Sequence, residues 1–114
     1  MRDLIKVIKA LSNPTRIRII KLLEKKRTCV CELTEILKIE QPSVSHHLRI
    51  LNDAGLVVDL RNGLWMDYEL SKEKYNKYAP QLLELISSCL NDDPKVLDDI
   101  KVSKKVKREE ICKR

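Results

Sequence analysis

In the first half of the chain, hydrophobic residues recur every three or four positions, which is the spacing of amphipathic helices. This pattern predicts a first helix over residues 3–11. Asn13 is a good N-cap and Pro14 a good first helical residue, so a second helix is expected to begin there. A third, short helix is expected over about residues 30–38, and a fourth opens at Pro42 after a three-residue connection.

The fourth helix has a narrow apolar stripe. Val44, Leu48 and Leu51 lie at positions i, i+4 and i+7, so one face of this helix is expected to be buried. The opposite face is polar, because a helix turns by about 100° per residue. The polar residues on that face or at the N-terminal end of the helix include Gln41, Ser43, Ser45, His46 and Arg49.

The pattern then changes to two runs that are typical of strands, residues 56–60 and 64–70. The Asn62-Gly63 dipeptide between them is a strong signal for a hairpin turn. Two short helices that are joined by a tight connection and followed at once by a hairpin make a winged helix-turn-helix. We therefore predict a mainly α fold with a small β-hairpin.

A longer helix is expected after the hairpin. Pro80 fits its first position, because a proline inside a helix would cost about 3 kcal/mol. Pro94 would end this helix. Residues 1–92 are therefore predicted to form one winged-helix and dimerisation domain, and the charge-rich residues 93–114 a tail or a loose last helix. The apolar stripe expected on the longer helix consists of Leu82, Leu83, Ile86, Cys89 and Leu90.

Composition narrows the class of protein. The 114 residues have room for one domain, and the absence of Phe leaves a thin aliphatic core that suits a dimer. A net charge of +6 favours a polyanionic partner. No apolar run reaches the roughly 20 residues that cross a bilayer, and the N-terminus lacks a signal-peptide core. We expect a cytoplasmic protein without a membrane partner, whose four cysteines stay mostly reduced. No nucleophile–base constellation or phosphate loop stands out, so an enzyme is not expected.

The polar face of the fourth helix predicts binding to double-stranded DNA. It is free to enter a major groove about 12 Å wide, where Arg49 is expected to pair with guanine. A winged helix that binds only proteins is the alternative, and it would show no salt-dependent affinity for a duplex. The other expected DNA contacts are Gln41, Ser43, Ser45 and His46 on the same helix, Thr15 and Arg16 at the start of the second helix, and Arg61 at the hairpin tip.

Several segments resemble the ArsR/SmtB family of metal-sensing repressors, and the resemblance covers about residues 3–90. It implies a homodimer formed through the first and the long late helix, bound to an imperfect palindrome. It also implies repression that is relieved when an inducer binds. The segments that carry it are ALSNPTRIRI at 10–19, SVSHHLRIL at 43–51, AGLV at 54–57 and RNGLW at 61–65.

The segment Cys29-Val30-Cys31-Glu32-Leu33 resembles the Cys-Val-Cys-Asp-Leu motif of the arsenic- and cadmium-type members of this family. The resemblance implies As(III), Sb(III) or a soft divalent metal such as Cd, Pb or Zn as inducer, because thiolates suit polarisable ions. On an ideal helix, residues i and i+2 are about 200° apart and could not share one ion. We therefore expect the helix start to unwind at 28–29 when an inducer binds.

The chain departs from both types. Arsenic-type members have a further cysteine where this chain has Thr34, and cadmium-type members have N-terminal cysteines that it lacks. A third thiolate ligand for the inducer would come from Cys112, from Cys89 or from a small thiol. Cys112 is the preferred candidate, because a mobile tail can reach across to the thiol pair within a subunit or between subunits. Cys89 is expected to have a structural role in the apolar stripe.

Two alternatives to a thiol-bound inducer stay open. The thiol pair could be a redox switch, or the repressor could have no metal inducer. A metal site between the long helices is not expected, because no His follows His47. His46 and His47 diverge on their helix, and we expect His46 to face DNA and His47 to make a structural hydrogen bond.

Overall fold

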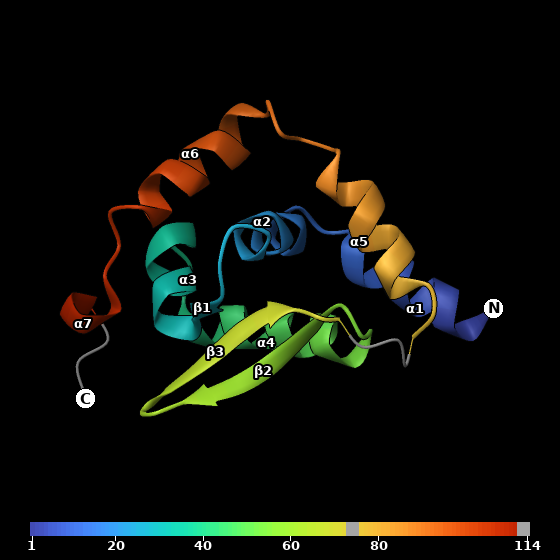
Figure 1. Ribbon diagram of the computed structural model, residues 1–114, viewed down its shortest axis with the longest axis horizontal. Helices are drawn as coiled ribbons and strands as arrows, with labels where there is room; N and C mark the ends of the chain where they lie inside the picture. Colours follow the sequence, from blue (N-terminus) through green and yellow to red (C-terminus); the bar gives the residue numbers. More distant parts are fainter. Residues whose placement is uncertain (73–75, 112–114) are drawn as a thin grey trace.

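The computed structural model describes residues 1–72 and 76–111 and contains several helices with a small antiparallel sheet at one edge (Figure 1). The predicted mainly α winged helix-turn-helix is confirmed. In chain order the elements are α1 (Arg2–Leu11), α2 (Pro14–Leu23), β1 (Thr28–Cys29), α3 (Val30–Leu37), α4 (Gln41–Asp53), β2 (Val57–Asn62), β3 (Trp65–Leu70), α5 (Ala79–Ser87), α6 (Pro94–Ser103) and α7 (Arg108–Ile111).

The predicted starts of α2 and α4 agree with the structure to within a residue. The side chain of Asn13 accepts a hydrogen bond from the backbone N–H of Arg16 at 3.1 Å, as an N-cap does, and Pro14 opens the helix. Pro42 lies in the first turn of α4. The three residues of the predicted stripe on α4, Val44, Leu48 and Leu51, have no exposed surface and belong to the one aliphatic core.

The wing is a hairpin of β2 and β3. Asn62 pairs with Trp65, so the turn between the strands is the two residues Gly63 and Leu64. Gly63 has φ of +61°, and a two-residue turn with a positive φ at its first position favours glycine. The hairpin signal in the sequence is thus confirmed, with its turn one residue later than Asn62-Gly63.

A third strand was not predicted. β1 pairs antiparallel with β3, so that Thr28 lies opposite Tyr68 and Cys29 opposite Asp67, and the strand order is β1-β3-β2. Two residues are too short to show an alternating pattern, so this strand has no signal in the sequence. β1 brings the cysteine motif into the same sheet as the wing.

The late helix is shorter than expected, because α5 ends at Ser87 rather than near Pro94. The hydroxyls of Ser87 and Ser88 donate to the carbonyl oxygens of Glu84 and Leu85, at 2.6 and 2.8 Å. Such side-chain bonds compete with helix continuation, and Leu90 turns the chain with φ of +61°. Cys89 therefore lies beyond α5, half-buried, and not on a helical stripe.

The segment after residue 92, expected as a tail or loose helix, contains α6. Asp99 is buried and holds Arg18 of α2 by two hydrogen bonds of 2.8 and 2.9 Å, and Val96 is also buried. α6 contacts α2 and α3, so it is packed on the domain. In the sequence, Ser71 is also a candidate cap for a short helical turn that reaches Tyr75 and Tyr78, and residues 73–75 of that segment lie outside the described residues.

Candidate DNA interface and thiol pair

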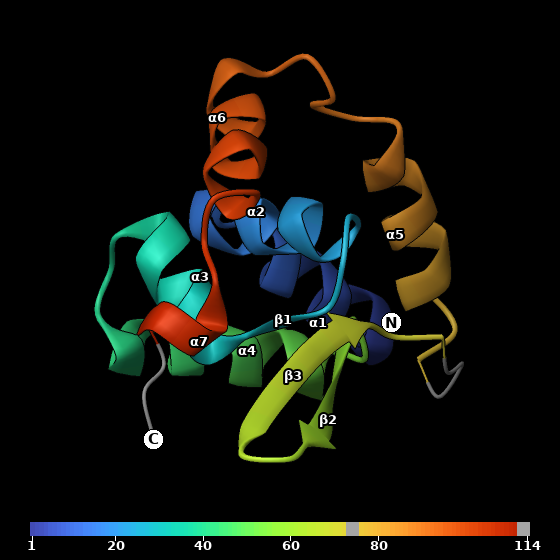
Figure 2. The same ribbon diagram turned by 60° about the vertical axis from the view of Figure 1, so that its left-hand side comes forward.

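α4 lies along one edge of the molecule with β2 and β3 beside it, in both views (Figures 1 and 2). Its outer face is exposed at Gln41, Ser43, His46 and Arg49, and Ser45 is half-buried. The structure thus places these five side chains on one surface. It is not covered by any described part of the chain.

The wing is attached directly to α4. Asn52 Nδ2 donates to Asp59 Oδ1 at 3.0 Å, which ties the C-terminal end of α4 to β2. Arg61 is exposed near the end of β2. Helix α4 and the wing tip therefore face the same side as one unit, which is the arrangement that reads a major groove with a helix and a neighbouring groove or phosphate with a wing.

Arg16, expected to bind a phosphate, has other partners. Its Nε donates to the carbonyl oxygen of Ala10 at 2.6 Å and its Nη2 to that of Lys9 at 3.3 Å, so the guanidinium caps the last turn of α1. Its Nη1 lies 3.2 Å from Nδ1 of His47. Arg16 thus positions α4 against α1, while Thr15 is half-buried in the first turn of α2.

His47 makes the structural hydrogen bond that the sequence predicted. An arginine can only donate, so Nδ1 of His47 accepts and its ring proton is on Nε2. Burial lowers the pKa of His47, and the positive charge of Arg16 and neighbouring His46 add to this effect. His46 is exposed, and the two ring centroids lie 5.8 Å apart.

Cys29 is buried, with 2% of its surface exposed, whereas Cys31 is half-buried. Cys29 is the N-cap of α3: its sulfur faces the backbone N–H of Glu32, and the Glu32 carboxylate accepts from the Cys29 N–H at 3.0 Å. Burial raises the pKa of the Cys29 thiol to about 11, so the thiol is protonated near neutral pH.

The structure corrects the expected unwinding at residues 28–29. Both residues already lie outside the helix, in β1, and α3 begins at Val30. What keeps the Cys29 sulfur from a ligand is its burial between α3 and β3. Exposing this sulfur therefore requires β1 or the start of α3 to move relative to the wing.

Sequence reasoning missed Glu32 as a partner of the thiol motif. The spacing Cys-x-x-Glu places a cap and a glutamate as a Ser-x-x-Glu capping box does, and this signal could have identified it. Within residues 1–72 and 76–111, no three His, Cys, Asp or Glu side chains are grouped to hold a metal ion. Cys112, the preferred third thiolate, lies outside the described residues.

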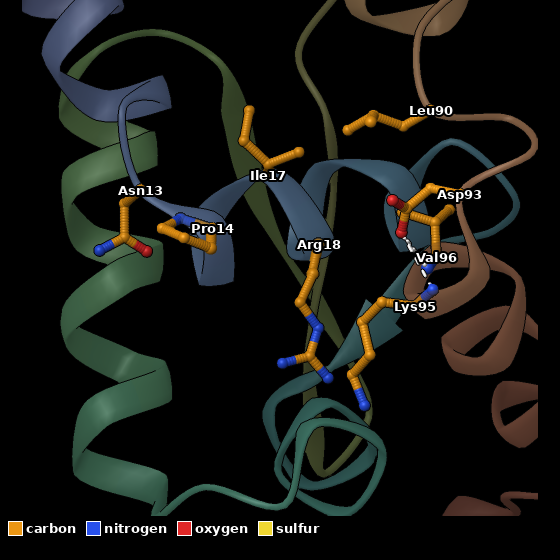
Figure 3. Close-up of a pocket in the computed structure, with 8 residues that line it drawn as sticks. All are labelled: Asn13, Pro14, Ile17, Arg18, Leu90, Asp93, Lys95 and Val96. Atoms are coloured by element: carbon orange, nitrogen blue, oxygen red, sulfur yellow. Dashed lines mark hydrogen bonds between the residues drawn. The ribbon is translucent and has the colours of Figure 1, made fainter.

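One described pocket lies between α2 and the start of α6, and no thiol belongs to its lining. It measures about 430 Å³ between the N-terminal half of α2 and residues 90–96, with Ile17 and Leu90 toward one end and Arg18 and Lys95 toward the other (Figure 3). None of the residues that line it belongs to the cysteine motif, so this pocket is not part of the thiol pair.

Comparison with known proteins identifies the family. Residues 13–58 match the model described as "Bacterial regulatory protein, arsR family". The chain is 36% identical to the arsenical resistance operon repressor of Staphylococcus xylosus over 87 residues, which are 76% of this chain and 83% of that protein. The chain belongs to the ArsR family. It is also 42% identical to the arsenical resistance operon repressor of Bacillus subtilis over 69 residues, 60% of this chain and 66% of that repressor.

Solved structures of transcriptional regulators have the same fold. The transcriptional repressor BigR from Xylella fastidiosa superposes with a TM-score of 0.68 at 27% identity, covering 82% of this chain and 88% of that one. A homodimeric winged helix-turn-helix domain from Mycobacterium bovis gives a TM-score of 0.67 at 22% identity and 82% coverage of both chains. Because the matched family and the relatives are regulators of transcription, the chain is a DNA-binding transcriptional regulator and not an enzyme, as predicted.

None of the helices within residues 1–72 and 76–111 combines the length and the apolar character of a membrane-spanning helix.

Proposed function

We propose that this ArsR-family protein is a repressor that binds operator DNA as a homodimer through α4 and the wing. One observation carries the proposal: α4 buries only the stripe at Val44, Leu48 and Leu51, and its polar face is exposed beside the wing. The net charge of +6 supports a DNA partner. A regulator of transcription acts where the DNA is, so we propose a cytoplasmic location.

The roles that we propose for the individual residues follow from their places on α4, the wing and α2. Arg49 reads guanine in the major groove, because a guanidinium matches the two acceptors of that base. Arg61 contacts a minor groove or a phosphate from the wing. Arg16 supports the interface from behind, by holding α4 through His47. The remaining proposed contacts, to bases or phosphates, are Gln41, Ser43, Ser45, His46 and Thr15.

The proposed dimer uses α1 and α5, which lie beside each other in both views (Figures 1 and 2). Ile5 and Ile8 of α1 are 41% and 45% exposed, and Leu85 of α5 is 58% exposed. Exposed aliphatic side chains gathered on neighbouring helices favour burial against a second copy. Two copies would present two α4 helices to the two half-sites of a palindrome.

We further propose that Cys29 and Cys31 bind the inducer, which is arsenite, antimonite or a soft divalent metal. With arsenite, each thiol proton joins one hydroxide of As(OH)₃ and leaves as water, while an As–S bond replaces that As–O bond. The buried, protonated Cys29 thiol fits the closed form that binds DNA. Cys112 is the proposed third ligand, and printed names of relatives such as the Bacillus subtilis repressor support arsenic as the inducer.

A gel-shift series on operator fragments selected by wild-type protein tests this function. Arg49→Ala is expected to weaken specific binding by about 1–3 kcal/mol, the range for one lost guanine contact. Raising the salt concentration is expected to weaken wild-type binding steeply. Operator affinity that is unchanged in Arg49→Ala would remove Arg49 from the base-reading residues, and affinity independent of salt would contradict DNA binding itself.

The same series tests the thiols with arsenite, cadmium and peroxide. Cys29→Ser combined with Cys31→Ser is expected to keep DNA binding and to lose release by arsenite or cadmium. Cys89→Ser, outside the pair, is the matched control and is expected to respond as wild type. Release of the double variant by the same ions would place the sensing site elsewhere, and release by peroxide alone would favour the redox switch.

A further inference from the structure

Arg108 of α7 lies between two buried carboxylates that belong to different elements. Its Nη2 donates to Glu32 Oε1 of α3 at 3.2 Å and to Asp67 Oδ1 of β3 at 2.7 Å. Glu32 is 5% exposed and Asp67 is fully buried. The guanidinium also lies 5.0 Å from the centre of the Trp65 ring. Charge-assisted hydrogen bonds of this kind are strong, so one arginine joins α7, α3 and the wing.

Each carboxylate has a second partner, and together these form a continuous chain of hydrogen bonds. Glu32 Oε1 also accepts from the backbone N–H of Cys29 at 3.0 Å. Asp67 Oδ2 accepts from Asn62 Nδ2 at the end of β2 at 3.0 Å. Cys29 and Asp67 are in addition directly opposite each other in the β1–β3 pairing. These hydrogen bonds therefore connect the thiol motif, through Arg108, to the base of the wing turn.

Helix α7 depends on this arginine for its attachment. It has only the four residues Arg108–Ile111, and none of them is buried. α7 contacts α3, and both views show it beside that helix (Figures 1 and 2). A short segment without buried apolar side chains has little else to hold it in place, so loss of the Arg108 contacts is expected to release it.

We propose that Arg108 is a latch: bound to Glu32 and Asp67, it keeps the Cys29 thiol closed and the wing fixed, and its release opens both together. Where an inducer opens the latch, this inference rests on the proposed function above. Ligation of the Cys29 sulfur moves β1 or the start of α3, and this separates Glu32 from Asp67. One guanidinium can no longer reach both, so inducer binding at the thiols loosens the wing. The latch thus has two states, closed and open, and both the thiol pair and the wing shift the balance between them.

The latch is tested first without DNA and without inducer. The reduced full-length protein is treated with iodoacetamide at pH 8, and the modification of each cysteine is followed by peptide mass spectrometry. Arg108→Met removes the charge and keeps the length of the side chain. It is expected to raise the rate at Cys29 about tenfold, a coupling of ordinary size, and to change Cys31 much less. Lys107→Met, at the exposed neighbouring position, is the matched control and is expected to behave as wild type.

Hydrogen exchange of the wing is the second readout. The amides of 57–70 are expected to exchange faster in Arg108→Met than in wild type. Wild-type rates at both Cys29 and the wing in a folded Arg108→Met protein would overturn the latch. If the Asp67 carboxylate, left without Arg108, unfolds that variant, Arg108→Met combined with Asp67→Asn removes the charges of both Arg108 and Asp67. The rate of Cys29 modification and the hydrogen exchange of the wing then decide for or against the latch in the same way.

Sodium arsenite separates this inference from the proposed inducer site. Arsenite is expected to speed wing exchange in wild type and to add little in Arg108→Met, whose latch is already open. Arsenite bound at Cys29 and Cys31 with unchanged wing exchange would overturn the coupling and leave the inducer site intact. Open Cys29 in Arg108→Met without arsenite binding to either protein would overturn the inducer site and support the latch.

Discussion

His47 shows how a single protonation state can hold two helices together. Its Nδ1 accepts from Arg16, which requires a neutral ring, and folding lowers its pKa from 6.5. Below about pH 6.5 the unfolded chain therefore binds more protons than the folded one. The stability that His47 contributes is complete above that pH and is lost progressively as the pH falls from 6.5 toward the lower pKa of His47 in the folded protein.

The corresponding prediction uses His47→Asn, which keeps an acceptor near the position of Nδ1 and does not titrate. The melting temperature of this variant is expected to fall less between pH 7 and pH 5 than that of wild type. Differential scanning calorimetry at several pH values measures it. Ser43→Ala, at an exposed position of the same helix without a titratable side chain, provides the control and is expected to keep the wild-type slope. Equal slopes for wild type and His47→Asn would contradict the argument.

Individual residues differ in how far the sequence predicts them. Periodicity alone placed Val44, Leu48 and Leu51 in the core, because burial of a helix face follows from spacing. The inward role of Arg16 was missed, because its partners are carbonyl oxygens of the preceding helix, and a backbone acceptor has no sequence signal. The link from Glu32 to the wing was also missed, because it runs through Arg108, which is 76 positions away in the sequence.

Among the elements, α5 ends where a buried lysine holds it. Lys21 of α2 is 1% exposed, and its ammonium donates to the Ile86 carbonyl oxygen and to Asn91 Oδ1, both at 3.0 Å. It also pairs with Glu24 at 2.8 Å. A cation at the C-terminus of a helix satisfies its last carbonyls and its dipole, so Lys21 fixes the end of the proposed dimerisation helix.

Lys21→Met is therefore expected to destabilise the protein by about 1–3 kcal/mol, because it leaves a buried acceptor unsatisfied. Urea unfolding measures the loss, and the slope of the transition is expected to stay unchanged. Lys25→Met, at an exposed position four residues later, is expected to have no measurable effect. A variant at position 21 as stable as wild type would show that apolar packing replaces the lysine without cost.

Element boundaries were predicted where local chemistry sets them and missed where tertiary contacts do. Asn13 and Pro14 fixed the start of α2, since a cap and a first-turn proline act locally. The apolar positions up to Leu90 suggested a longer α5, but the serine hydroxyls and Lys21 end it at Ser87. Strand β1 exists only because β3 lies beside it, 38 positions or more further along the chain.

At the scale of the whole molecule, the exposed aliphatic residues are distributed unevenly. Ile8 on α1 and Leu85 on α5 lie on neighbouring helices at one end, whereas Leu97 on α6 lies at the other end of the molecule (Figure 1). The resemblance to the family implies a dimer through the first and the long late helix, and the exposed residues on α1 and α5 support these two helices as its interface. An obligate pairing of two DNA-binding units links their affinities, because the second half-site is bound within the same complex.

Ile8→Glu or Leu85→Glu is therefore expected to give a folded monomer whose operator affinity is lower by about a hundredfold or more, the range for losing one of two linked contacts. Sedimentation at micromolar concentration measures the oligomeric state, circular dichroism the fold, and gel shift the affinity. Leu97→Glu, 50% exposed in wild type, is the matched control and is expected to remain dimeric. If Ile8→Glu and Leu85→Glu sediment as wild type does while Leu97→Glu becomes monomeric, then α6 and not the α1–α5 surface joins the two copies.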